Sequence, residues 1–232
     1  MGTSFWRYTV LIALKDLRIE GRSREILYTM GFSAALVVLV FSFALANATD
    51  PAQSPITAAG VLWAATLFTG TVALARVLDR ERENESIRSL LLSPAPRAAI
   101  YGGKLVATSL LMVVVEIVLA LLVGVLFSAA VFEHPFWLGL VLLLGSLGFA
   151  SAGVVFSAAL LRSRSRESLL GALLFPIVIP VLLAASRATV CLFDPLAPDL
   201  EPVAFWTRFL LVTDVIYILL GLWVFEPIVT GD

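Results

Sequence analysis

Few side chains in this sequence could take part in catalysis, and they stand far apart. Residues 145–148 read Gly-Ser-Leu-Gly, a pattern that faintly resembles an intramembrane serine protease, but a serine nucleophile needs a general base. The only histidine, His134, belongs to a different segment. Because the chain has one histidine and one cysteine, Cys191, a multi-histidine metal site and an intramolecular disulfide are both excluded. We therefore predict no catalytic residue, no metal site and no enzyme activity.

A nucleotide-binding loop is the second kind of site that the residues suggest and then exclude. Gly103 and Lys104 are superficially similar to the end of a phosphate-binding loop. That motif requires a glycine five positions before the second glycine, and Ser or Thr after the lysine. This chain has Ala98 and Leu105 at those positions. Any ATP hydrolysis must therefore come from another polypeptide.

The elements that position these residues are predicted to be membrane-spanning helices. Of the 232 residues, 60 % are hydrophobic and 14 % are charged, against about 45–50 % and about 25 % in soluble proteins. Six apolar stretches, without the alternation of a membrane barrel, are each long enough to cross a hydrocarbon core of roughly 30 Å. We predict an all-α polytopic membrane protein in which residues 1–232 form one transmembrane domain. The predicted spans are residues 26–48, 56–78, 105–127, 136–161, 169–186 and 209–225.

Basic residues are distributed unevenly between the two sides of the predicted bundle. Fourteen of the sixteen lysines and arginines precede the first span or lie around the second-to-third and fourth-to-fifth connections. Only Arg187 and Arg208 lie on the opposite side. The positive-inside rule therefore places both termini in the cytoplasm. With a net charge of −1, we expect no nucleic acid partner.

The segment before the first span, residues 4–22, has the pattern of a helix that lies on the membrane. At about 100° per residue, four basic side chains fall within an arc of roughly 80°, with apolar residues on both flanks. The helix either anchors the topology through membrane lipids or also forms the rim of a docking surface for a cytoplasmic partner. The basic stripe is Arg7, Lys15, Arg18 and Arg22; one flank is Phe5, Tyr8, Ile12 and Ile19, and the other is Trp6, Val10, Leu14 and Leu17.

The longest cytoplasmic connection, residues 79–104, is the best candidate for an interaction site. Its first half favours a charged helix with one apolar edge, which Pro94 and Pro96 must end. Such a helix could press into a groove on a soluble partner and pass a displacement to both attached spans. The alternative is a solvated connection. The candidate coupling residues are Glu81, Arg82, Glu83, Glu85, Ile87, Arg88, Leu90, Leu91, Pro94 and Arg97.

Polar residues and prolines also occur within the predicted spans. Glu116 is the only ionisable residue near the centre of a span, where an unpaired charge costs at least about 2.5–3.5 kcal/mol. We expect it to face the bundle interior, either bonding a neighbouring helix or serving a cargo path or conformational switch. Asp214 is expected near the outer interface, paired with Arg208. Pro176 and Pro180 are expected to kink the fifth span, for hinging or for packing. Close helix approach is expected at Gly139, Gly145, Gly148, Ala152 and Gly153.

The loop at residues 79–104 is also where the sequence resembles a known family. The chain is similar to the heme exporter protein B family, the permease-like subunit of an ABC system for bacterial cytochrome c maturation. It resembles ABC-2-type permeases more generally in its charged loop with a leucine-proline end. The features that carry the resemblance are residues 5–7 (FWR), Trp63, residues 81–84 (EREN), residues 90–97 (LLLSPAPR), residues 101–104 (YGGK), Pro176 and Pro180.

The resemblance implies a membrane permease subunit in the bacterial inner membrane, with ATP and Mg²⁺ bound by a separate ABC ATPase. ATP hydrolysis would be coupled to release of a heme-loaded periplasmic chaperone or to heme movement. It also implies a second polytopic subunit with a tryptophan-rich heme-binding motif. Because the tryptophans of this chain are scattered, we expect heme to be handled by the complex and no cofactor to be bound directly. They are Trp6, Trp63, Trp137, Trp206 and Trp223.

Two other functions remain open from the sequence. An ABC-2-type permease could export another amphiphile, such as a lipid, a glycan or a drug. Alternatively, the chain could be a membrane scaffold that transports nothing. The two would differ in whether disruption of residues 79–104 abolishes function while assembly persists.

Overall fold

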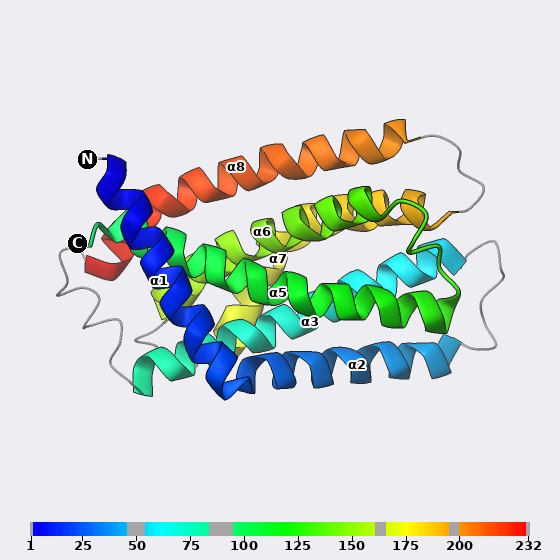
Figure 1. Ribbon diagram of the computed structural model, residues 1–232, viewed down its shortest axis with the longest axis horizontal. Coiled ribbons are helices and arrows are strands. Elements are labelled where there is room, and N and C mark those ends of the chain that lie inside the picture. Colours follow the sequence, from blue (N-terminus) through cyan, green and yellow to red (C-terminus); the bar gives the residue numbers. More distant parts are fainter. Residues whose placement is uncertain (1, 46–53, 84–94, 161–165, 195–199, 231–232) are drawn as a thin grey trace.

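The protein is a bundle of long helices preceded by one oblique helix. The structure, a computed structural model, describes residues 2–45, 54–83, 95–160, 166–194 and 200–230. In Figure 1 the two ends of the chain lie at the same end of the bundle, where α1 crosses it. Within the described ranges every regular element is a helix, as predicted. The helices are α1 (Gly2–Ser23), α2 (Glu25–Leu45), α3 (Ser54–Glu83), α5 (Arg97–Phe127), α6 (Pro135–Leu160), α7 (Arg166–Phe193) and α8 (Glu201–Thr230).

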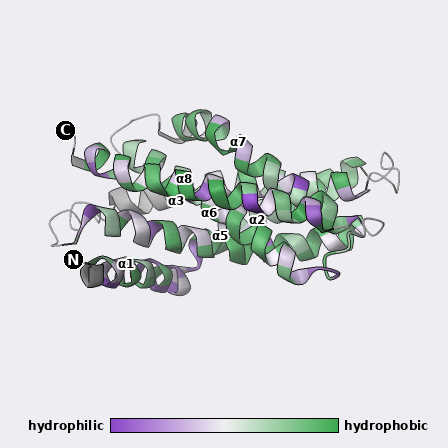
Figure 2. Cartoon of the chain, turned by 90° about the horizontal axis from the view of Figure 1, so that it is seen from above, coloured by the Kyte–Doolittle hydropathy of each residue, from purple (hydrophilic) through white to green (hydrophobic). Residues whose placement is uncertain are grey.

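Six of these helices are long and apolar enough to cross a membrane, which confirms the six predicted spans. Figure 2 shows that hydrophobic residues predominate along these helices, whereas α1 contains both hydrophilic and hydrophobic residues. Three predicted spans were too short. α5 begins at Arg97, α7 continues to Phe193 and α8 extends from Glu201 to Thr230, because helical backbone continues through the charged residues that the hydrophobicity limits excluded. The candidate spans are Glu25–Leu45, Pro55–Ala75, Arg97–Phe127, Pro135–Leu160, Leu169–Phe193 and Glu201–Val229.

Helix α6 occupies the centre of the bundle and packs against α3, α5, α7 and α8. Its small residues make this possible. A Cβ atom at Gly145 would collide with the ring of Trp63, and one at Gly153 would collide with Leu74, both on α3. The predicted role of these glycines in close approach is confirmed. It is wrong for Gly139, where a Cβ atom would meet nothing within 4 Å.

Helix α1 matches the predicted leader helix in extent and joins α2 through a sharp turn at Arg24. This residue has φ 54°, a left-handed backbone conformation that non-glycine residues adopt rarely. Glu20, only 1 % exposed, accepts a hydrogen bond from the Leu27 backbone N–H at 2.9 Å. The carboxylate thereby satisfies one of the amides left without a partner at the start of α2. The backbone of Arg24 and the carboxylate of Glu20 therefore shape the junction between α1 and α2.

Candidate functional site

Two glycines allow α1 to lie directly on the first turns of α5. A Cβ atom at Gly103 would stand 2.7 Å from Cβ of Ile12 and 3.0 Å from the carbonyl oxygen of Thr9. At Gly102 the nearest atom would be Cγ2 of Thr9, at 3.3 Å. A side chain at Gly103 would overlap Ile12 and push α1 away from α5, whereas one at Gly102 would form a tight contact with the Thr9 side chain. The Gly-Gly-Lys sequence, rejected above as a phosphate loop, is therefore a helix-packing sequence.

An ion pair also joins α1 and α5 at this contact. Lys104, on α5 and 7 % exposed, places Nζ 3.7 Å from Oδ2 of Asp16 on α1. Asp16 also contacts Lys15, with Nζ and Oδ1 3.0 Å apart. We call the contact formed by Thr9, Ile12, Asp16, Gly102, Gly103 and Lys104 the elbow seam. It joins α1 to α5 within the first two turns after Arg97, where α5 begins.

The outer side of α1 carries the predicted basic stripe. Arg7, Lys15, Arg18 and Arg22 are exposed. The two predicted apolar flanks have different surroundings. Phe5, Tyr8 and Ile12 are partly or fully buried, whereas Ile19 of that flank is exposed. On the other flank Trp6, Val10 and Leu14 are exposed, with Trp6 at 68 %. One flank therefore packs largely on the bundle, and the other is open to the surroundings.

The predicted coupling residues fall at the edges of the described chain. Glu81, Arg82 and Glu83 form the last turn of α3, which confirms that the helix continues into the charged segment. Arg97 begins α5, and Pro96 before it has a non-helical backbone, as expected from the proline pair. The last turn of α3 and the first turn of α5 lie at the end of the bundle that α1 crosses (Figure 1). Glu85, Ile87, Arg88, Leu90, Leu91 and Pro94 lie outside the described residues.

Tyr101 joins α5 to two further helices beside the elbow seam. Its side chain is fully buried, and its hydroxyl donates a hydrogen bond to the Ser151 carbonyl on α6 at 3.2 Å. Its ring lies 5.6 Å from that of Phe225 on α8, between centroids. Gly221 provides the space, since a Cβ atom there would collide with the tyrosine. Sequence reasoning noted this tyrosine only as part of a motif, because its contacts come from helices distant in sequence.

Glu116 faces the bundle interior, as predicted. It is 2 % exposed, and Ser146 on α6 donates a hydrogen bond to its Oε2 at 2.7 Å. The serine that the sequence suggested as a nucleophile is thus an interhelix donor. The indole N–H of Trp63 on α3 donates a hydrogen bond to the Thr189 hydroxyl on α7 at 2.9 Å, beside Gly145 of α6. One polar bond therefore joins α5 to α6, and another joins α3 to α7.

Other polar residues differ from their expected positions. Asp214 is 3 % exposed and lies against Gly148 of α6, with no hydrogen-bond partner for either oxygen in the described part of the chain. The expected pairing with Arg208, which is exposed, is not found. Cys191 lies in the last turns of α7, not in a loop, because that helix extends past Arg187. Across the described residues, no group of three His, Cys, Asp or Glu could hold a metal.

Pro176 and Pro180 both lie inside α7. Each lacks an amide hydrogen and so leaves one carbonyl of the preceding turn without its helical donor. Next to this region, the hydroxyl of Tyr217 on α8 donates to the Ile177 carbonyl at 2.5 Å. A hydrogen bond from α8 therefore reaches the α7 backbone between the two prolines. The expected kink stays a prediction.

Comparison with known proteins places this arrangement among membrane transport components. A model of the family described as "CcmB protein" matches residues 7–225. A protein of Haemophilus influenzae (strain ATCC 51907 / DSM 11121 / KW20 / Rd), named "Heme exporter protein B", is 30 % identical over 177 residues. The alignment covers 75 % of this chain and 78 % of that relative. The matched region extends from α1, through the elbow seam, into α8.

Proposed function

Since the chain belongs to the CcmB protein family, we propose that it is the permease-like membrane subunit of a heme-exporting ABC system in the bacterial inner membrane. The observation that carries the proposal is the family match over residues 7–225, which contains both the elbow seam and the loop at residues 79–104. The proposed partners are an ABC ATPase that binds ATP and Mg²⁺, a tryptophan-rich heme-handling membrane subunit and a periplasmic heme chaperone.

The elbow seam supports a route for mechanical coupling. The ATPase docks on the coupling residues between Glu81 and Arg97, at the joint between α3 and α5. A displacement of this loop reaches α3 and α5 directly, since Glu83 ends one helix and Arg97 begins the other. It reaches α1 through the Asp16–Lys104 pair and the close contact at Gly103. Three helices therefore respond to one docking event.

The exposure of α1 supports its position at the cytoplasmic interface of the membrane. Trp6, Val10 and Leu14 provide an exposed apolar row that enters the lipid, and the exposed arginines of the basic stripe meet anionic head groups. Together with the distribution of basic residues, this exposure supports a cytoplasmic position for both termini. The loop at residues 79–104 then faces the cytoplasmic ATPase.

Heme itself is assigned to the partner subunits. The tryptophans of this chain do not form a cluster in the sequence, and Trp63 has its indole nitrogen engaged with Thr189. We therefore propose that ATP-driven movement of this subunit releases the heme-loaded chaperone from the tryptophan-rich subunit. Passage of heme between the spans is not needed for this mechanism.

Affinity purification from native membranes tests the proposal. The tagged full-length protein is extracted in detergent, its partners are identified by mass spectrometry, and heme is measured by absorbance. Recovery of an ABC ATPase with a tryptophan-rich polytopic subunit and heme is the expected result. Recovery of an ATPase alone would instead favour export of another amphiphile, and recovery of neither would favour a scaffold.

A matched pair of charge reversals tests the docking site. Glu83→Arg changes the last residue of α3, at the proposed docking site, and should reduce ATPase recovery at least several-fold. Glu133→Arg makes the same change at an exposed position between α5 and α6, on the opposite side of the bundle, and should leave recovery unchanged. Equal recovery with both variants would exclude the docking site at the end of α3.

A further inference from the structure

The carboxyl group of Asp214, near the middle of α8, is enclosed where α6, α7 and α8 meet. Its Oδ1 atom would stand 2.5 Å from a Cβ atom placed at Gly148 of α6, and the same Cβ atom would meet the side chain of Val181 on α7 at 2.9 Å. Both carboxyl oxygens are enclosed, and neither has a hydrogen-bond partner among the described residues. The three helices therefore close around a carboxyl group to which no described group donates.

No basic side chain of the described residues pairs with this carboxyl group. Arg208, six residues earlier on α8, is exposed and lies about 120° around the helix from Asp214. Helix α6 contains no ionisable residue, and Arg187 of α7 is exposed. On α5, Tyr101 meets α8 seven residues further along, at the glycine described above. Tyr217, one turn along α8 from Asp214, is the titratable neighbour, and its hydroxyl already donates to a carbonyl of α7.

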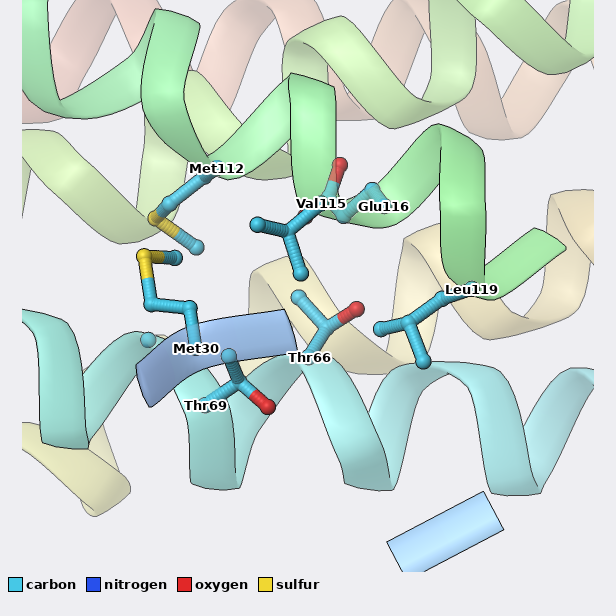
Figure 3. A pocket seen from close by; sticks show the side chains of 8 residues that line it. Met30, Thr66, Thr69, Met112, Val115, Glu116 and Leu119 are labelled. Atoms are coloured by element: carbon cyan, nitrogen blue, oxygen red, sulfur yellow. The ribbon is translucent and has the colours of Figure 1, made fainter. Parts of the chain in front are cut away.

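Glu116 of α5 is a separate enclosed carboxyl group with different surroundings. Ser146 of α6 donates a hydrogen bond to it at 2.7 Å. Figure 3 shows Glu116 on α5, with Thr66 of α3 across a small space to which α8 contributes no residue. Residues two apart on a helix point about 200° away from each other. Because Glu116 contacts Ser146 and Asp214 contacts Gly148, the two carboxyl groups lie on opposite sides of α6.

We propose that Asp214 is a proton-binding site that is occupied at neutral pH, and that the bound proton allows α8 to pack against α6 and α7. A carboxylate without water or donors is strongly disfavoured in an enclosed site within a membrane, whereas the protonated acid is uncharged. The neighbouring glycine and valine supply no donor for the anion. Release of the proton therefore requires water to reach the carboxyl group, which happens when α8 separates from α6 and α7. The site does not depend on the proposed role in heme export.

Infrared spectroscopy of the unaltered full-length protein tests for the proton directly. Exposed aspartates are ionised at about pH 7, so a protonated carboxyl C=O band that shifts on carbon-13 labelling of aspartate comes from an enclosed aspartate. Asp214 is the buried aspartate of the described chain, and the label leaves the band of Glu116 unshifted. In a detergent without ester groups, the shifted band should be present in the unaltered protein and absent in Asp214→Asn. Absence of the band from the labelled unaltered protein, or its persistence in Asp214→Asn, overturns the proposal.

The pH dependence of stability tests the same site by a second route. In the unfolded chain the carboxyl group is ionised above about pH 4, so unfolding releases the bound proton and becomes more favourable as the pH rises. Between about pH 5 and about pH 7, Tm of the unaltered protein in detergent should fall relative to that of Asp214→Asn by about 3–5 °C per pH unit.

Glu133→Gln is the matched control for this measurement, because Glu133 is exposed and lies between α5 and α6. Its carboxylate is ionised in both the folded and the unfolded chain over this range, so the difference in Tm from the unaltered protein should stay constant with pH. A constant difference for Asp214→Asn as well would show that Asp214 binds no proton in the folded protein, and would overturn the proposal. If Asp214→Asn does not fold, the infrared band of the labelled unaltered protein decides.

Discussion

Asp16 of α1 and Lys104 of α5 form an ion pair, 3.7 Å between Oδ2 and Nζ, across the contact between the oblique helix and the bundle. The lysine is 7 % exposed, whereas Lys15, the second cation beside Asp16, is exposed. The two lysines beside Asp16 therefore differ in exposure: Lys104 is enclosed and Lys15 is exposed. Loss of Asp16 removes the carboxylate that lies beside an enclosed lysine, whereas loss of Lys15 changes only an exposed side chain.

This asymmetry predicts different costs for two substitutions. Asp16→Asn should destabilise the protein by about 1–3 kcal/mol, because it breaks an ion pair with an enclosed lysine. Lys15→Met, the control, should cost less than about 1 kcal/mol, as expected of an exposed pair. Thermal unfolding in detergent measures both. If Asp16→Asn combined with Lys104→Met is no more stable than Asp16→Asn alone, the ion pair is not the cause.

Close packing at Gly103 predicts opposite outcomes for two glycine substitutions. Gly103→Ala should destabilise by about 1–3 kcal/mol, because the new Cβ atom overlaps Ile12 and forces α1 away from α5. Gly139→Ala meets open space and should be neutral or stabilising by up to about 1 kcal/mol, through helix propensity. Thermal unfolding gives the two signs. A stabilising Gly103→Ala would contradict the packing described for the elbow seam.

The elbow seam also predicts a functional difference between the same two variants. Under the proposed function in heme export, Gly103→Ala should reduce the yield of mature c-type cytochromes, because the proposed coupling from the loop to α1 would be weakened. Gly139→Ala should leave that yield unchanged. Heme staining of membrane proteins from cells that express each variant measures the effect, with expression levels matched by immunoblot. Unchanged yield in Gly103→Ala, with protein present at normal levels, would remove α1 from the coupling route.

The bond between Trp63 and Thr189 predicts a selective cost for losing one hydroxyl. Thr189→Val leaves the enclosed indole N–H without an acceptor, which should cost about 1–3 kcal/mol. Thr207→Val is the matched control, since both threonines are buried and donate to the carbonyl four residues earlier. The difference in unfolding free energy between the two variants isolates the indole bond. Equal costs would show that Trp63 gains nothing from Thr189.

The Tyr101 hydroxyl predicts a smaller effect beside the elbow seam. Tyr101→Phe removes the hydrogen bond to Ser151 while keeping the ring against Phe225, and should cost about 0.5–1.5 kcal/mol. Tyr28→Phe, at a tyrosine that is 66 % exposed, should have no measurable effect. Thermal unfolding of the paired variants tests this. A neutral Tyr101→Phe would mean that the Ser151 carbonyl does not depend on this donor.

Hydrophobicity and charge were sufficient to predict the six spans and the leader helix, because lipid requires long apolar helices. The inward position of Glu116 also followed, since an exposed carboxylate is costly in a membrane. Its partner Ser146 could not be predicted, because that contact depends on the rotation of α6 relative to α5. The roles of Gly103 and Asp214 were likewise inaccessible. They depend on which distant helix folds against each position, information that no local pattern contains.

The enclosed position of α6 has a consequence for biogenesis. Spans enter the membrane in the order of synthesis, so α6 is inserted before α7 and α8, which cover part of it, have been made. During that interval its Gly148 surface lacks both Val181 of α7 and Asp214 of α8. A chain that stops after α6 would expose this small-residue surface to lipid or to quality-control proteases. Completion of the native protein thus depends on its last two helices closing around one inserted earlier.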